Sequence, residues 1–225
     1  MIYIPDMTQI IALLLTALMF PSAAPKAGPW KSLFDGKSLD AWQRWKSAEP
    51  PEKWVIQDGV LSKEGNASDL VSKEEFGDFE LELEWKIGEA GNSGVFYRGT
   101  EEYDAIYWSA PEYQLLDNIK AEDNKKPNHL AGSVYDLYAA PAEAAKPAGE
   151  WNSTRIVAKG NHVEHWLNGK KVAAYDVGTP DWNTALAASK FKTYANFAAA
   201  KKGRFGIQGN HPGSLALRNI RVREL

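Results

Sequence analysis

The sequence predicts an all-β fold built as a two-sheet antiparallel sandwich. Short runs of alternating apolar and polar residues recur along most of the 225 residues, and turn-forming dipeptides separate them. Nine Trp, nine Tyr and eight Phe also favour strands. The spacing of the runs does not match alternating strands and helices, so a parallel α/β sheet is not expected.

Two hairpins are the strongest local signals. The run WVIQDGVL (Trp54–Leu61) predicts two short strands joined by Asp58-Gly59. Asn168-Gly169 likewise joins His162–Leu167 to Lys171–Tyr175. Asp-Gly and Asn-Gly suit the tight turn in which both central residues need a positive φ.

The remaining strands are predicted from alternation. In FELELEW (Phe79–Trp85) the apolar residues occupy one face and Glu80, Glu82 and Glu84 the other. These glutamates are expected on a solvated face, and a catalytic or metal-binding cluster is the alternative. Further predicted strands are Gly94–Arg98, Tyr113–Leu116, Ser133–Tyr138, Thr154–Ala158, Phe205–Gln208 and Leu215–Val222. The Ala-rich stretch Asp181–Ala200 predicts a helix or a long loop.

Composition excludes several classes of function. Cys is absent, which excludes disulfides, thiolate metal sites and a cysteine nucleophile. The formal charge is -3 with no long basic run, so no nucleic-acid partner is expected. The four His show no H-x-x-x-H spacing, so nothing dictates a zinc triad. No cofactor is required by the sequence; a divalent cation held by carboxylates and carbonyls is a possible addition, with ligands unknown.

The first 24 residues are interpreted as an export signal. Ile10–Phe20 is an apolar run of 11 residues, and Pro21-Ser22-Ala23-Ala24 supplies small residues at a cleavage site. The competing interpretation is a buried N-terminal strand or helix. We therefore expect a mature domain of residues 25–225 that is periplasmic or secreted. Without Cys it carries no lipid-attachment site, so no membrane anchor is expected, and no protein partner can be inferred.

Several stretches together resemble the bacterial 3-keto-disaccharide hydrolase family. No single motif is decisive, but their order along the chain from about Trp30 to Leu225 is specific. The stretches are LFDGKSLDAW (Leu33–Trp42), FELELEWKIG, NSGVFYRG (Asn92–Gly99), PEYQLLDN (Pro111–Asn118), AGSVYDLY (Ala131–Tyr138), KPAGEWNSTRIV (Lys146–Val157) and VEHWLNGKKV (Val163–Val172). The resemblance implies a concanavalin A-like jelly roll with the sugar site on its concave sheet face. It also implies cleavage of glycosides already oxidised at carbon 3, with a small carbohydrate as the substrate.

The sequence departs from the family at one place. Where the family has Leu-Gln-Asp-His-Gly after its final strand, this chain has Ile207-Gln208-Gly209-Asn210-His211. The Asp and His positions are therefore Gly209 and Asn210, with a His one place later. Either His211 takes over through a shifted loop, or this paralogue has lost a function.

The residue types and the resemblance together give a candidate site. A ketone at carbon 3 acidifies the hydrogen at carbon 2, so the reaction needs a base, an oxyanion stabiliser and an acid for the leaving group. Glu112 is the predicted base, Arg98 the oxyanion partner and His211 the acid. Gln114, which shares a strand face with Glu112, is expected to orient the sugar together with Gln208 and Asn92.

Two further features bear on the mechanism. Asp117 is five residues from Glu112, so an unbroken strand points it to the other face and ordinary two-carboxylate hydrolysis is poorly supported. Trp151 and Trp166 are predicted to stack on sugar rings, as is Trp108, although core packing is the commoner fate of a strand Trp. The rival interpretation is a non-catalytic carbohydrate-binding module of the same fold, because fold alone does not decide function.

Overall fold

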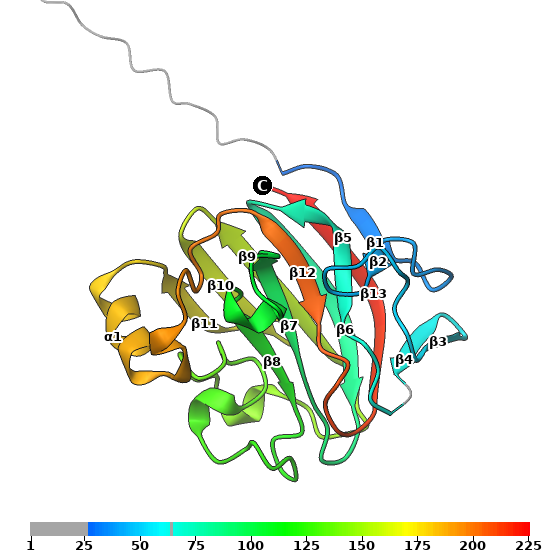
Figure 1. Ribbon diagram of the computed structural model, residues 1–225. Helices are drawn as coiled ribbons and strands as arrows, with labels where there is room; N and C mark the ends of the chain where they lie inside the picture. Colours follow the sequence, from blue (N-terminus) through cyan, green and yellow to red (C-terminus); the bar gives the residue numbers. More distant parts are fainter. Residues whose placement is uncertain (1–26, 64) are drawn as a thin grey trace, which may run out of the picture.

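The computed structural model describes residues 27–63 and 65–225 as an antiparallel sandwich of two sheets (Figure 1). The predicted export signal lies outside these residues. The larger sheet has the order β11 (Lys170–Asp176), β10 (His162–Leu167), β9 (Asn152–Lys159), β6 (Phe79–Ile87), β13 (Leu215–Glu224), β4 (Val60–Lys63) and β3 (Trp54–Gln57), with β1 (Lys31–Phe34) also paired to β13. The smaller sheet has the order β2 (Trp42–Gln43), β5 (Leu70–Phe76), β12 (Gly203–Ile207), β7 (Asn92–Gly99) and β8 (Glu112–Leu116).

The core lies between the two sheets and is built from alternate residues of their strands. On β6, Leu81, Leu83 and Trp85 are buried, and they belong to the same cluster as Tyr113 and Leu115 of β8. This alternation confirms the predicted two-sheet sandwich, because each strand places its apolar face inward. The pairing of β3 with β4 and of β10 with β11 confirms both predicted hairpins.

The hairpin turns have the predicted backbone geometry. Asp58 and Gly59 have φ values of 51° and 76°, and Asn168 and Gly169 have 51° and 79°. Both central residues are therefore in the left-handed region, which Asn, Asp and Gly tolerate best. β3 pairs with β4 and β10 with β11 across these turns.

Helix is a minor component, as expected. The predicted Asp181–Ala200 excursion contains α1 (Pro180–Ala188) and the 3₁₀ turn η4 (Lys190–Thr193), and its remainder is not helical. The Thr179 hydroxyl caps α1 by accepting from the Trp182 amide (3.2 Å). Trp182 then stacks on Tyr175 at 5.1 Å between ring centroids, which fixes α1 beside β11 (Figure 1). No helix in the described residues is long and apolar enough to cross a bilayer.

The predicted strand Ser133–Tyr138 is wrong. Asp136 has a φ of 55°, and the Val134 amide donates to the Tyr138 carbonyl (3.0 Å), so the segment turns back on itself. Val134 makes only an isolated bridge to Tyr113 of β8. The turn covers the outer edge of β8, whose backbone groups are paired with it instead of with another strand.

The three outward glutamates of β6 form ion pairs with arginines of the neighbouring strands. Glu80 contacts Arg155 and Arg223, Glu82 contacts Arg221, and Glu84 contacts Arg218. Glu80 is only 4% exposed, so the expectation of a solvated face is wrong for this residue. The catalytic or metal-binding alternative finds no support, because each carboxylate already has a guanidinium partner.

Candidate functional site

The candidate site begins with strand β8, which presents two polar side chains on the outer face of the five-stranded sheet. Tyr113 and Leu115 are fully buried between the sheets, so Glu112 and Gln114 must point to the opposite face. The turn at 132–135 then covers them from the edge of the sheet. Its backbone pairs with β8, for example through the Tyr135 amide, which donates to the Glu112 carbonyl (3.0 Å).

Gly94 explains how Glu112 fits against the sheet. Gly94 faces β8 from the neighbouring strand β7, where it pairs with Gln114. A Cβ atom on Gly94 would overlap the Glu112 carboxyl group, with Oε1 and Cδ both inside van der Waals distance. The absence of a side chain at Gly94 therefore lets the Glu112 carboxyl lie flat on β7.

Glu112 is the one unpaired buried carboxyl of the described residues. Four carboxyl side chains there are buried, namely Glu80, Glu112, Asp117 and Asp136. The other three make ion pairs or accept backbone N–H groups, whereas Glu112 has neither. Burial raises the pKa of Glu112 to about 8, with Asp123 and Asp69 adding to the rise and the Lys190 cation opposing it.

Amide side chains line the site next to Glu112. With its nitrogen turned toward Glu112, Gln114 donates to Oε1 of that residue (3.2 Å) and to the Ser93 carbonyl (3.0 Å). Its amide lies 3.3 Å from Oδ1 of Asn92. Gln208 follows β12 and lines the same pocket. Its backbone N–H donates to the Gly94 carbonyl (3.0 Å), which fixes its position. All three predicted substrate-binding amides therefore meet at one place.

His211 reaches this pocket from the loop after β12. Gly209 has no room for a side chain, because a Cβ there would collide with the backbone of Ala67 and Ser68. Its amide donates to Asp69 (2.8 Å). The buried Lys63 donates to the carbonyls of Gly209 (3.3 Å) and His211. The loop thus brings the histidine in one position later than in the family pattern.

The electrostatics of His211 follow from its neighbours. Burial lowers its pKa below the ordinary value of about 6.5, and the Lys63 and Lys190 cations lower it further, against the opposing charge of Asp123. The imidazole is therefore neutral at neutral pH. Glu112 is mostly protonated under the same conditions.

Three pocket residues were not found from the sequence: Asp123, Tyr135 and Lys190. The Tyr135 hydroxyl donates to Asp123 (2.8 Å), and the Lys190 ammonium lies 4.2 Å from the Tyr135 ring centroid. Lys190 begins η4, and no local motif marks it. Only the packing of η4 beside the turn at 135 brings it to Glu112.

Behind the pocket, His129 connects two aspartates. Its Nδ1 lies 2.6 Å from Asp123 and its Nε2 lies 2.9 Å from Asp136. Asp136 in turn accepts the backbone amide of Lys190 (2.7 Å). The buried His129 therefore holds the wall of the pocket that carries Asp123 and Lys190.

This pocket is small, about 50 Å³, which admits the edge of a sugar ring. A larger groove of about 710 Å³ lies on the outer face of the eight-stranded sheet, between Trp30 and Trp166. Its carboxylates Glu82 and Glu84 are both paired with arginines. The small pocket is the candidate site, because it holds the one buried carboxyl of the described residues that has neither an ion pair nor a backbone N–H partner.

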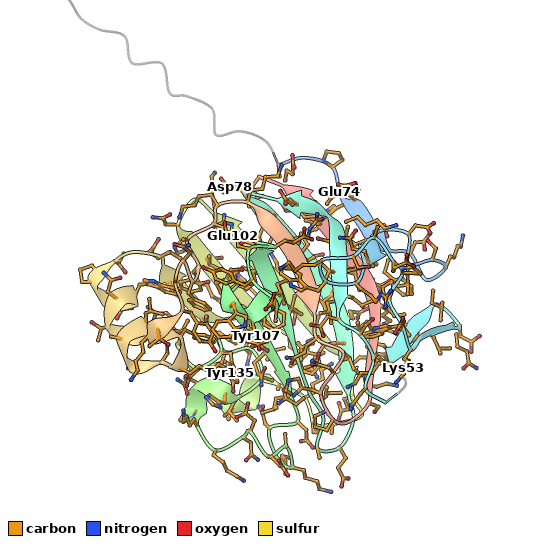
Figure 2. All side chains as sticks on the ribbon, in the orientation of Figure 1. Lys53, Glu74, Asp78, Glu102, Tyr107 and Tyr135 are labelled. Carbon is orange, nitrogen blue, oxygen red and sulfur yellow. The ribbon has the colours of Figure 1, made fainter. Side chains whose placement is uncertain are left out.

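The prediction for Arg98 is wrong. Arg98 has a φ of 56°, next to a register irregularity between β7 and β12, so strand alternation fails at this residue. Its guanidinium donates to the Gly77 carbonyl (3.1 Å), the Gly160 carbonyl (2.7 Å) and Asp78 (3.2 Å). Figure 2 shows Asp78 at the upper end of the sandwich and Tyr135 in its lower half. Arg98 therefore joins loops, and Lys190 is the cation of the pocket.

Trp151 and Trp166 also lie away from the pocket. Trp166 is on the outer face of the eight-stranded sheet under Arg155, whose guanidinium carbon is 4.9 Å from the ring centroid. Trp151 is covered by Arg218 at 4.1 Å on the same sheet. Because the two outer faces are on opposite sides of the sandwich, neither Trp can stack on a sugar bound at Glu112.

Two other titratable side chains, one on β10 and one directly after β8, are structural. His165 is fully buried between the sheets, where it contacts the Tyr97 hydroxyl (2.9 Å) and the Gly132 carbonyl (3.1 Å). Burial lowers its pKa to about 4, so it is neutral. Asp117 accepts the amides of Ala90 (2.9 Å) and Ile119 (3.0 Å) and does not pair with Glu112.

No group of three or more His, Asp or Glu side chains in 27–63 and 65–225 is arranged to hold a metal ion. The divalent cation considered from the sequence stays a prediction.

Comparison with known proteins places the chain in a family. Residues 29–223 match a family model described as a 3-keto-alpha-glucoside-1,2-lyase-like domain. A 3-keto-disaccharide hydrolase of Bacteroides thetaiotaomicron is 34% identical over 226 residues, covering 86% of this chain and 78% of the relative. The resemblance seen in the sequence is thereby confirmed, as is the prediction of an enzyme.

Solved structures agree. A crystal structure of a candidate glycosyl hydrolase from Parabacteroides distasonis superposes with a TM-score of 0.80 at 29% identity, covering 88% of this chain and 94% of that one. A β-agarase B in complex with agaro-octaose has a TM-score of 0.56 at 12% identity, covering 90% of this chain and 96% of that one. This second likeness confirms the concanavalin A-like jelly-roll fold and nothing beyond it.

We expect Gly94→Ala to displace Glu112, because the added methyl group needs the space of its carboxyl. Turnover should fall by about tenfold or more, while circular dichroism stays that of the wild type. Gly28→Ala is the matched control, since a Cβ there meets its nearest atom at an ordinary 3.5 Å. Equal activity of the two variants would contradict this account of Gly94.

We expect Arg98→Lys to act on stability. Lysine cannot reproduce the guanidinium contacts, so at least one buried carbonyl loses its donor at a cost of about 1–3 kcal/mol in the free energy of unfolding. Urea denaturation measures this loss. The kcat of the folded variant should stay within about twofold of the wild type; a large fall in kcat with unchanged stability would return Arg98 to the reaction.

Proposed function

The chain belongs to the 3-keto-alpha-glucoside-1,2-lyase-like domain family, and on this basis we propose that it cleaves glycosides whose sugar ring carries a ketone at carbon 3. The proposed reaction is elimination followed by addition of water. The observation that carries the proposal is the pocket in which the unpaired carboxyl of Glu112 meets His211 and the ammonium group of Lys190. These are a proton donor, a proton acceptor and a cation.

The two pKa shifts favour one assignment of roles. Glu112, with its pKa raised to about 8, is mostly protonated at pH 7, and His211, with its pKa lowered, is neutral. Groups whose environments move their pKa values in this way serve as acid and base respectively. We therefore assign Glu112 as the general acid and His211 as the general base, the reverse of the roles suggested by the sequence.

The proposed reaction is an elimination at carbons 1 and 2 followed by addition of water. His211 removes the proton from carbon 2, and the electron pair forms an enolate whose oxygen, at carbon 3, is stabilised by Lys190. The enolate expels the group at carbon 1 as the C–O bond breaks, and Glu112 gives its proton to the leaving oxygen. Water then adds at carbon 1 and gives one proton to the Glu112 carboxylate, while carbon 2 regains its proton from the imidazolium. The net change is hydrolysis.

The amides have the remaining task of orientation. Asn92, Gln114 and Gln208 offer neutral donors and acceptors beside the acid, which suits the hydroxyl groups of a sugar. Asp123, whose partner His129 holds it in place, supports Tyr135 at the rim. Burial and the bond to Asp123 raise the pKa of Tyr135 above its ordinary value, so its hydroxyl stays a hydrogen-bond donor. The non-catalytic binding alternative leaves the unpaired acid unexplained.

Substrates with different leaving groups test the assignment of Glu112 as the acid and His211 as the base. Glu112→Gln should lower kcat for an alkyl 3-keto-glucoside by about a hundredfold, because that leaving group needs a proton. The loss should be about tenfold smaller for a 4-nitrophenyl 3-keto-glucoside, whose leaving group departs as an anion. His211→Ala should impair both substrates alike, since both need the proton at carbon 2 to be removed.

The pH dependence gives an independent check. With Glu112 as acid, kcat/KM rises as His211 loses its proton below about pH 6.5 and falls as Glu112 loses its proton through about pH 8. Glu112→Gln should abolish the fall on the alkaline side. A wild-type kcat/KM that rises through pH 8, with equal losses of Glu112→Gln on both substrates, would restore Glu112 as the base.

We also propose that the protein acts in the periplasm or outside the cell. The apolar run Ile10–Phe20 and the small residues before Pro25 support this. N-terminal sequencing of protein isolated from its native host should find a terminus near Pro25. An intact Met1 or Met7 in the functional protein would contradict export by this signal.

A further inference from the structure

Two adjacent aromatic side chains are exposed near the proposed site. Of the residues described, only four large apolar side chains are exposed, and Tyr107 (39%) and Trp108 (37%) are two of them. The other two, Val55 and Ile119, are isolated examples. Neighbouring exposed rings are unusual enough on a soluble domain to suggest a binding surface.

The two rings belong to a row of three. Tyr107 and Trp108, in the turn η1 (Ile106–Trp108), stack with ring centroids 5.8 Å apart, and Trp108 lies 4.3 Å from Tyr194. We call Tyr107, Trp108 and Tyr194 the aromatic row. Because each ring supports the next, the surface is formed before any ligand arrives.

Backbone contacts hold the aromatic row in place. The Ala198 amide donates to the Ser109 carbonyl (2.8 Å), and the Tyr103 hydroxyl donates to the Ala195 carbonyl (2.6 Å). Below the row, Ile106 packs on Phe96 of β7, the residue that pairs with Glu112. The row therefore rests on the same face of the five-stranded sheet as the acid.

The row is also connected to the pocket through η4. Lys190, which lines the pocket, lies 5.1 Å from the Phe191 ring, and Phe191 lies 5.5 Å from Tyr194. On the other side, η1 leads through three residues to Glu112. Figure 2 shows Tyr107 and Tyr135 in the same part of the view.

The pocket is too small to hold the whole substrate. Its volume of about 50 Å³ admits the reacting edge of one ring, whereas sites that enclose a whole small molecule measure about 300 Å³ or more. The group attached at carbon 1 must lie outside it. Aromatic rings suit the flat apolar face of a sugar or aryl ring.

We propose that the aromatic row is the subsite for the leaving group, and that the enzyme prefers 3-keto-glycosides with a ring-shaped group at carbon 1. This inference rests on the proposed function and extends it to substrate preference. A methyl glycoside has nothing to place on the row, whereas a disaccharide or a phenyl glycoside does. The preference should therefore depend on Tyr107 and Trp108.

The test compares three 3-keto-glucosides, with methyl, phenyl and glucosyl groups at carbon 1. Trp108→Ala should raise KM for the phenyl and glucosyl compounds on the order of tenfold, since one aromatic contact contributes about that factor. KM for the methyl compound should change by less than about twofold. Tyr107→Ala should act in the same direction, and Trp108→Phe should recover most of the loss.

Ile119→Ala is the matched control, because Ile119 is 71% exposed and outside the row. It should leave all three KM values unchanged, and thermal melting should show that every variant is folded. A loss with the phenyl compound alone would limit the subsite to aryl groups, and a loss with the glucosyl compound alone would limit it to sugars; both support the proposal.

Two outcomes overturn the inference. If Trp108→Ala raises KM equally for all three compounds, or for none, the row is not a leaving-group subsite, while the proposed function stands as long as the wild type cleaves them. If the wild type cleaves none of the three, the proposed function fails and this inference fails with it. Dilution-dependent dimers lost in Trp108→Ala, with unchanged KM values, would assign the row to self-association instead.

Discussion

The burial of one face of every strand is the constraint from which the rest of this structure follows. Because Tyr113 and Leu115 pack between the sheets, Glu112 and Gln114 must face outward. A shift of one residue in β8 would bury the acid in the apolar core and expose the tyrosine. The position of the candidate site is therefore a consequence of core packing.

The chemistry of the pocket depends on which carboxyl group has no ion-pair partner. On the eight-stranded sheet, Glu80, Glu82 and Glu84 each form an ion pair with an arginine of a neighbouring strand. On the five-stranded sheet, Glu112 has only amides beside it and the Lys190 ammonium at longer range. Desolvation then dominates and its pKa rises. The larger groove has more space, but the smaller pocket holds the group that can exchange a proton near neutral pH.

The departure from the family pattern after β12 has a structural explanation. The backbone of Ala67 and Ser68 lies against Gly209, so a side chain is excluded at the position of the family's Asp. Lys63 fixes the carbonyls of the loop, and the loop delivers His211 to the pocket. Of the two alternatives left by the sequence, the geometry supports the replacement of one histidine by another. Burial, together with the charges of Lys63 and Lys190, lowers the pKa of the His211 imidazole, which changes the role it can take.

Strand alternation and turn chemistry are local properties, so the sandwich, the two hairpins and the faces of β6 and β8 could be predicted from the sequence. It also identified Glu112, the three amides and His211. The position of Arg98 could not be predicted in this way, since its positive φ and the nearby register irregularity break the alternation from which that position was inferred. The same is true of Asp123, Tyr135 and Lys190, which reach the pocket from a turn and a 3₁₀ segment with no period to read. The protonation of Glu112 and His211 depends on the side chains that surround them. Contacts between segments far apart in the chain bring these side chains together, and a local pattern does not encode such contacts.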